Sequence, residues 1–128
     1  MSIAVPTDRE LTILRVLWDR GEATVRQVYE ALRGDLPIVQ NTVQAFLRTM
    51  AAKGLVSFRT EGRSFVYRAA IEPDATRQGL LGRVLERAYD GAIDQLVEGA
   101  VGLSRPTREE RDRIRALLDR LEAEEGGG

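Results

Sequence analysis

The sequence contains neither cysteine nor histidine. Without cysteine the chain has no disulfide framework and no thiolate metal site, and without both residues it has no zinc finger and no Ser-His nucleophile. A glycine-rich phosphate loop is also missing, because Gly62 stands alone in its stretch of sequence. These absences predict that the protein is not an enzyme and that it holds no metal and no cofactor.

Long apolar runs are missing as well, so the sequence predicts no transmembrane helix. The first residues lack the basic and then apolar pattern of a secretory signal peptide. We therefore expect a cytoplasmic protein that has no membrane partner. A length of 128 residues allows one good hydrophobic core, or one small domain with an appendage.

The first third of the chain predicts two short amphipathic helices. Residues 7–10 and 24–27 form capping boxes, in which a threonine and the Glu or Gln three residues later satisfy free N–H groups at a helix start. Apolar residues follow each box at helical spacing, and Gly21 and Gly34 end the two stretches.

A third helix is expected from Ile38 to about Lys53, with Gly54 as a left-handed C-cap. Its apolar stripe consists of Val43, Phe46, Leu47 and Met50. The opposite side carries short hydrogen-bonding side chains, one alanine and one arginine, namely Asn41, Thr42, Gln44, Ala45 and Arg48. A face that meets only solvent more often carries Glu and Lys, whereas a face that reads base edges needs donors and acceptors. We therefore predict that the first four of these residues read DNA bases.

A basic hairpin is expected directly after this helix, with strands over residues 55–59 and 64–68 and a turn over residues 60–63. Its aromatic side chains are expected to pack rather than to stack on bases. Three helices followed by a hairpin are the order of a winged helix-turn-helix. We therefore predict a mainly α fold with a small β-hairpin wing, whose DNA-binding domain covers residues 1–72.

Charge is unevenly distributed along the chain. The formal net charge is −1, which argues mildly against nucleic acid as a partner. However, residues 1–70 hold 10 Lys/Arg and 7 Asp/Glu, a balance of +3, whereas residues 71–128 hold 9 and 13, a balance of −4. The local field steers a ligand more than the net charge does. The predicted contacts to DNA phosphates are Arg48, Lys53, Arg59, Arg63 and Arg68.

The second half of the chain predicts further helices. Asp74 is expected to cap the first of them, and residues 107–110 form a third capping box before the last. The glycines at positions 91, 99 and 102 should interrupt the helical pattern. The acidic and glycine-rich tail from Glu122 onwards is expected to fray.

These helices carry apolar faces that are too wide for a short extension to bury within itself. The simplest cover is a second copy in a two-fold dimer, so residues 73–128 are predicted to form a helical dimerisation domain. The predicted interface residues are Leu80, Leu81, Val84, Leu85, Tyr89, Ile93, Leu96, Ile114, Leu117, Leu118 and Leu121.

Four blocks of the sequence resemble the penicillinase-repressor family, the BlaI/MecI/CopY group of bacterial transcriptional repressors. They are the opening helix (residues 7–18), the second helix (23–32), the third helix with the start of the hairpin (41–56) and the wing (62–68). The likeness covers the whole N-terminal domain and continues more weakly through the C-terminal helices, which form the dimer in that family. It implies a sequence-specific repressor that binds a palindromic operator in double-stranded DNA as a homodimer.

The chain also departs from the family pattern. Val39 stands where the family usually has a small or hydroxyl residue, and Ala45 stands where many members have threonine, so a thymine methyl could meet a methyl group there. The cysteine ligands of the copper-responsive branch are absent. The family's other branch is released when a membrane sensor protease leads to cleavage, which makes a regulatory protease a candidate partner. The corresponding region, residues 98–101, lacks the Asn-Phe pair of that branch.

Two other functions compete with a repressor. A winged helix can serve as a protein-contact module with no bound DNA, and an enzyme subunit is made remote by the absences described above. Arg63 could likewise be a solvated turn charge, and residues 41–44 a solvated helix face. The arginines of the last helix alternate with acidic residues, which is typical of a solvated face with ion pairs along the helix.

Overall fold

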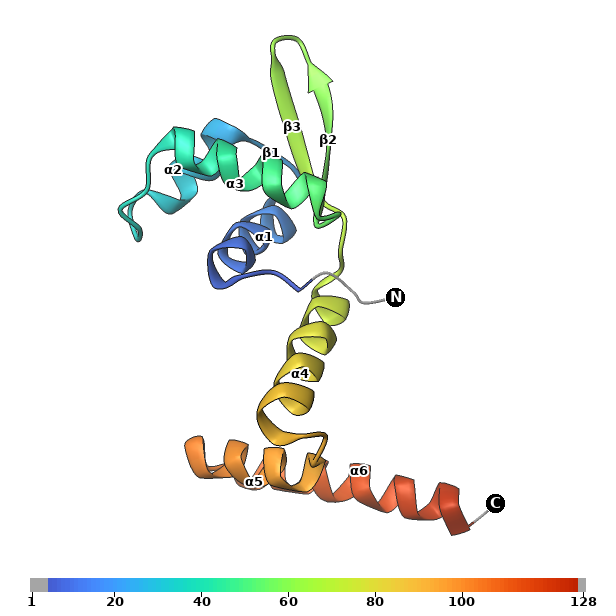
Figure 1. Cartoon of the computed structure of the whole chain (residues 1–128). Coiled ribbons are helices and arrows are strands. Elements are labelled where there is room, and N and C mark those ends of the chain that lie inside the picture. Colours follow the sequence, from blue (N-terminus) through green and yellow to red (C-terminus); the bar gives the residue numbers. More distant parts are fainter. Residues whose placement is uncertain (1–4, 127–128) are drawn as a thin grey trace. The chain divides into compact units, whose positions relative to one another are not determined.

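The computed structural model describes residues 5–126, and these residues form six helices and one three-stranded sheet (Figure 1). In chain order the elements are α1 (Asp8–Arg20), β1 (Ala23–Thr24), α2 (Val25–Leu32), α3 (Gln40–Ala52), β2 (Val56–Glu61), β3 (Ser64–Ala69), α4 (Pro73–Tyr89), α5 (Ile93–Leu103) and α6 (Arg108–Gly126). The mainly α fold with a hairpin wing is therefore confirmed. The chain divides into two compact units, Met1–Arg83 and Val84–Gly128, and the boundary between them in the sequence falls within α4.

All three predicted capping boxes are present. Thr7, Thr24 and Thr107 each accept a hydrogen bond from the backbone N–H three residues later, over 3.1–3.3 Å. In return, the Glu or Gln at that position accepts from the threonine backbone N–H over 2.9 Å. These reciprocal bonds fix where α1, α2 and α6 begin.

The core of the first unit lies between α1, α2, α3 and the sheet. Its fully enclosed side chains are Ile13, Leu14, Leu17, Val28, Val43, Leu47, Met50 and Leu55. Each such aliphatic side chain stabilises the fold by about 1.5–3 kcal/mol on burial. Trp18 and Phe46 pack at the edge of this core, and the indole N–H of Trp18 donates to the carbonyl of Ile71 over 2.8 Å. The sequence-based stripe of the third helix is confirmed.

α3 begins at Gln40, two residues later than predicted. The reason is local backbone conformation: Val39 takes the extended angles of an N-cap residue, with φ −107° and ψ 159°, so the helix cannot start before Gln40. The C-terminal prediction is confirmed: Gly54 has a φ of +81°, and the N–H of Leu55 reaches back to the carbonyl of Met50 over 2.9 Å.

The sheet has the order β1-β3-β2 and is antiparallel throughout. β1 was not predicted, because two residues are too few for an alternating pattern to be recognised. It pairs Ala23 with Tyr67 and Thr24 with Val66, so it ties the start of α2 to the base of the hairpin.

The hairpin β2–β3 extends beyond the helices of its unit as a wing (Figure 1). The predicted four-residue turn is wrong, because the strands pair as far as Glu61 and Ser64. Only Gly62 and Arg63 remain between them, and Gly62 takes a φ of +64°, which suits glycine in a tight turn. The expected packing of the wing aromatics holds only in part. Tyr67 is buried, whereas Phe65 remains 43% exposed and contacts Phe58 and Tyr67 with ring centroids 5.1 and 6.5 Å apart.

The later helices differ from the prediction at their ends. α4 starts at Pro73, so Asp74 lies inside its first turn rather than capping it. Gly91 does separate α4 from α5, but Gly99 and Gly102 lie within α5, where neighbouring residues keep the backbone helical. α6 continues to Gly126, so the prediction that the tail frays from Glu122 onwards is wrong for residues 122–126. Positions 127 and 128 of that tail lie outside the described residues. No helix within residues 5–126 is long and apolar enough to cross a membrane.

Candidate nucleic-acid interface

α3 presents a polar surface on the side away from the core. Val43, Leu47 and Met50 anchor the helix from beneath. On its outer side Asn41, Thr42, Ala45 and Arg48 are exposed, and Gln44 is half-buried. The predicted division of this helix into a core face and an outer face is therefore confirmed, while base reading by the outer face stays a prediction. A helix of this width fits the major groove of B-DNA.

A groove runs between the start of α2, the start of α3 and the wing. Its lining residues are Thr24, Val25, Arg26, Gln40, Gln44, Arg63, Ser64 and Phe65. The fold thus brings together Gln44, a predicted base-reading residue, and Arg63, a predicted phosphate contact that lies 19 positions away in the sequence. The groove therefore has the hydrogen-bonding amides of Gln40 and Gln44 and the guanidinium group of Arg63 in its lining.

Sequence reasoning missed Arg26 and Gln40 in this groove. The available signal was the capping box at Thr24, which marks the N-terminus of α2 and puts Arg26 in its first turn. Helix N-termini favour anions, because their first N–H groups are free and the helix dipole is positive there. Arg26 also forms an ion pair with Glu30 over 3.4 Å, but its side chain remains 72% exposed.

Two of the predicted phosphate contacts are held by carboxylates of the same unit. The ammonium of Lys53 lies 2.6 Å from Oε1 of Glu10. Arg59 contacts both Glu22 and Glu61 over 2.8 Å. To bind a phosphate, Lys53 would have to break its ion pair or contact Glu10 and the phosphate at the same time, and the same holds for Arg59 and its two carboxylate partners.

The remaining predicted phosphate contacts are Arg48, Arg63 and Arg68, and all three are exposed. Within residues 5–126 none of them forms an ion pair. Arg68 pairs in register with Ser57 near the base of the hairpin, and it lines a different hollow, beside Trp18 and Glu22 at the end of α1. The structure therefore brings Arg63, but not Arg68, to the groove beside α3.

The carboxyl group of Glu10 has a lowered pKa because of the groups that surround it. Burial raises the pKa of this carboxyl, but the hydrogen bond from Lys53 and those from Thr7 outweigh burial, so that its pKa lies below the ordinary value of 4.5. The carboxylate is 2% exposed and is therefore an ionised group inside the fold.

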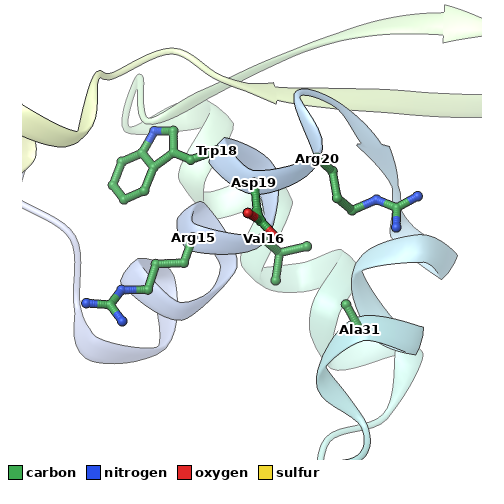
Figure 2. Close-up of a pocket in the computed structure, with 6 residues that line it drawn as sticks. All are labelled: Arg15, Val16, Trp18, Asp19, Arg20 and Ala31. Atoms are coloured by element: carbon green, nitrogen blue, oxygen red, sulfur yellow. The ribbon is translucent and has the colours of Figure 1, made fainter.

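A second hollow lies between α1 and α2 (Figure 2). It is lined by Arg15, Val16, Trp18, Asp19, Arg20 and Ala31. The guanidinium groups of Arg15 and Arg20 point in opposite directions, so the hollow does not gather positive charge (Figure 2). Within the described part of the chain, no group of three or more Asp or Glu side chains is placed to hold a metal ion.

The C-terminal unit leaves most of its apolar side chains in contact with solvent. Neither α5 nor α6 contains a buried residue. Among the predicted dimer residues, Leu80, Leu85, Tyr89 and Leu96 are half-buried, and the exposed ones are Leu81, Val84, Ile93, Ile114, Leu117, Leu118 and Leu121. Val97, Val101 and Leu103 are exposed as well and extend this apolar surface along α5.

Comparison with known proteins agrees with the resemblance in the sequence. The model of the penicillinase repressor family matches residues 6–120. The transcriptional regulator BlaI of Mycobacterium tuberculosis is 32% identical over 120 residues, which covers 93% of this chain and 86% of that protein. The solution structure of the DNA-binding domain of the repressor BlaI has a TM-score of 0.52 at 28% identity, and covers 59% of this chain and 93% of that one.

A further structure, monomeric BlaI of Bacillus licheniformis in complex with the blaP half-operator, has a TM-score of 0.51 at 27% identity and covers 58% of this chain and 90% of that one. These relatives are regulators of transcription rather than enzymes. With a match that spans the winged unit and most of the later helices, this chain belongs to the penicillinase-repressor family of DNA-binding transcriptional repressors.

Proposed function

We propose that this protein represses transcription by placing α3 in the major groove of duplex DNA, where Asn41, Thr42, Gln44 and Ala45 meet base edges. The observation that carries this proposal is the outer face of α3, which is exposed and rich in uncharged hydrogen-bonding groups. The relative that was solved with a half-operator supports the proposal through its similar fold.

Phosphate binding is assigned to the cations that surround this face. Arg63 reaches the groove from the wing, Arg26 from the first turn of α2, and Arg48 extends from α3 itself. Contacts of this kind fix the register of a protein on DNA without reading sequence. Lys53 and Arg59 take a smaller part in this proposal, because carboxylates already hold them.

The repressor is proposed to act as a homodimer on a palindromic operator. The exposed apolar residues of α4, α5 and α6 support this, because a second copy would remove them from water. Half-sites should then lie about one helical turn apart, or a multiple of it. We also propose that the protein works in the bacterial cytoplasm, and that a signal acting on the C-terminal unit relieves repression, with a regulatory protease as the candidate partner.

Salt dependence of DNA binding tests the proposal against the protein-contact alternative. The affinity of the full chain for duplex DNA should fall linearly in a plot of log affinity against log salt, because binding releases the counterions of the neutralised phosphates. A module that only contacts proteins would show no measurable binding, and hence no slope. That result would overturn the proposal.

Base reading is tested by comparing two substitutions on the preferred and on random DNA. Gln44→Ala should cost about 1–3 kcal/mol on the preferred site and relax selectivity at one base pair. Arg63→Ala should weaken binding to both DNAs alike. If both variants weaken preferred and random DNA equally, Gln44 does not read bases.

A further inference from the structure

Val39 occupies the N-cap of α3 without being able to cap it. Its carbonyl accepts from the N–H groups of Thr42 and Val43, over 3.1 and 3.2 Å, so it begins the helix as an N-cap residue should. Its side chain makes no capping hydrogen bond and is 62% exposed. In contrast, α1, α2 and α6 all start with a threonine that does cap. The start of α3 thus carries an exposed aliphatic group where a hydroxyl would favour the helix.

Three residues with exposed methyl groups lie in one row at the start of α3. Val39, Thr42 and Ala45 follow one another at a spacing of three residues, which forms a ridge across a helix surface. Each of them is exposed. The amides of Gln40 and Gln44 instead line the groove beside the wing. The outer side of the helix therefore has an amide flank and a methyl flank.

We propose that Val39, together with Thr42 and Ala45, reads the C5-methyl groups of thymines in the operator. This inference rests on the proposed function, because it assumes that α3 enters the major groove. Of the four DNA bases, thymine is the one that presents a methyl group in the major groove. Aliphatic side chains recognise that methyl group by apolar contact. N-terminal residues of a recognition helix are the ones that meet base edges. Val39 then selects for thymine at one base pair of the operator by apolar contact, without a hydrogen bond to the base.

The size of the effect follows from the burial of a methyl group. Removing one buried methyl from such a contact should weaken binding about fourfold. The probe is a set of duplexes that the full-length wild-type protein selects from a random pool. In the selected sequence, each thymine is replaced in turn by uracil, which lacks only the C5-methyl group. We expect at least one replacement per half-site to weaken binding about fourfold.

Val39→Thr separates this role from a structural one. The substitution keeps the shape of the side chain, exchanges one methyl for a hydroxyl and supplies the missing N-cap oxygen. We expect a higher midpoint of thermal unfolding together with about threefold to fourfold weaker binding to the selected duplex. On the duplex with uracil at the sensitive position, Val39→Thr and wild type should bind equally.

Thr49→Ser is the matched control. It also removes one exposed methyl from α3, further from the helix start, and it keeps a hydroxyl for the bond to the carbonyl of Ala45. It should bind as wild type does. If the pool yields no preferred sequence, the proposed function itself fails. If it yields one but no uracil weakens binding, or if Val39→Thr binds as tightly as wild type, the reading of thymine by Val39 is wrong while the repressor function stands.

Discussion

Glu10 joins the start of α1 to the end of α3. Its Oε1 accepts the backbone N–H of Thr7 over 2.9 Å and the ammonium of Lys53 over 2.6 Å. The same carboxylate therefore completes a capping box and pairs with the residue that follows α3. Through this contact the far end of the proposed reading helix is fixed to the first helix.

Glu10→Gln should destabilise the protein by about 1–3 kcal/mol at pH 7, because Lys53 loses its charged partner and sits only one-third exposed. The pKa of Glu10 is lowered in the folded state. Its contribution is thus fully present above the ordinary value of 4.5 and is lost as the pH falls through the lower folded pKa. Urea unfolding at pH 7 and at pH 3 measures both effects, and the variant should lose less stability on acidification than wild type.

Glu110→Gln provides the control for this prediction. Glu110 belongs to the capping box of α6, and hydrogen bonds from Thr107 lower the pKa of its carboxyl as well. It is exposed and has no lysine partner, so its replacement should change the stability less. A Glu10→Gln variant as stable as wild type at pH 7 would show that the contact with Lys53 contributes nothing.

Two arginines of the wing should differ in their effect on DNA binding. Arg63→Ala should reduce the salt slope by about one per half-site, because Arg63 lies at the groove beside α3. Arg59→Ala should reduce it less, because Glu22 and Glu61 already neutralise that guanidinium. Titrations of duplex DNA at several salt concentrations measure both slopes. Equal losses would mean that Arg59 leaves its carboxylates when DNA binds.

The difference between these two arginines could not be predicted from the sequence. Both lie in a basic hairpin, and composition alone makes both of them phosphate candidates. Glu22 lies 37 residues before Arg59 in the chain, and the contact forms only because the sheet brings them together. The position of Arg63 in a tight turn was predictable, because Gly62 marks the turn locally. Local signals identify a residue's place in its element, but not its partner from elsewhere.

At the scale of elements, the same limit separates what was predicted from what was missed. Capping boxes and the stripe of α3 act within a few residues, so the sequence alone predicts them. β1 depends on pairing with Tyr67 and Val66, more than 40 residues away. The hairpin turn was predicted too long because Thr60 and Glu61 are polar, although strand residues that face solvent are expected to be polar. The groove at α2 was missed for the same reason, since it exists only once three elements meet.

α5 offers a matched pair of glycines for testing helix packing in the C-terminal unit. A Cβ at Gly99 would lie 2.5 Å from the hydroxyl oxygen of Tyr89, whereas a Cβ at Gly102 would meet nothing within 4 Å. Gly102→Ala should therefore stabilise the protein by about 0.5–1 kcal/mol, since alanine favours helix. Gly99→Ala should be less stable than Gly102→Ala by about 1–2 kcal/mol, because the ring of Tyr89 must move.

Urea unfolding of both variants measures this difference. Tyr89→Phe in the Gly99→Ala background should recover most of the loss, because the hydroxyl is the atom that meets the new methyl group. If Gly99→Ala is as stable as Gly102→Ala, α5 and Tyr89 do not pack as closely as the structure has them.

At the scale of the whole molecule, charge and apolar surface are divided between the two halves of the chain. The winged half is basic and has a complete core, whereas the second half is acidic and leaves aliphatic side chains exposed on all of its helices. A single winged unit makes few contacts to DNA. Linking two units makes the second contact intramolecular, which can raise the affinity for a two-fold operator roughly 100-fold or more. Any event that separates the two copies should therefore release DNA without changing α3.

Leu117→Glu should separate the copies. Leu117 lies in the exposed apolar stripe of α6 with Ile114, Leu118 and Leu121, and a carboxylate there would be buried without a partner in the proposed interface. Ala116→Glu is the control, because it adds the same charge to the neighbouring position on the opposite side of the helix, where the residue is also exposed.

Sedimentation should find Leu117→Glu monomeric and Ala116→Glu dimeric. The monomer should bind a two-half-site duplex at least about 100-fold more weakly than wild type, and a single half-site about as well as one wild-type protomer does. A Leu117→Glu protein that stays dimeric, or a monomer that keeps full affinity for the two-half-site duplex, would show that the stripe of α6 does not hold the copies together on DNA.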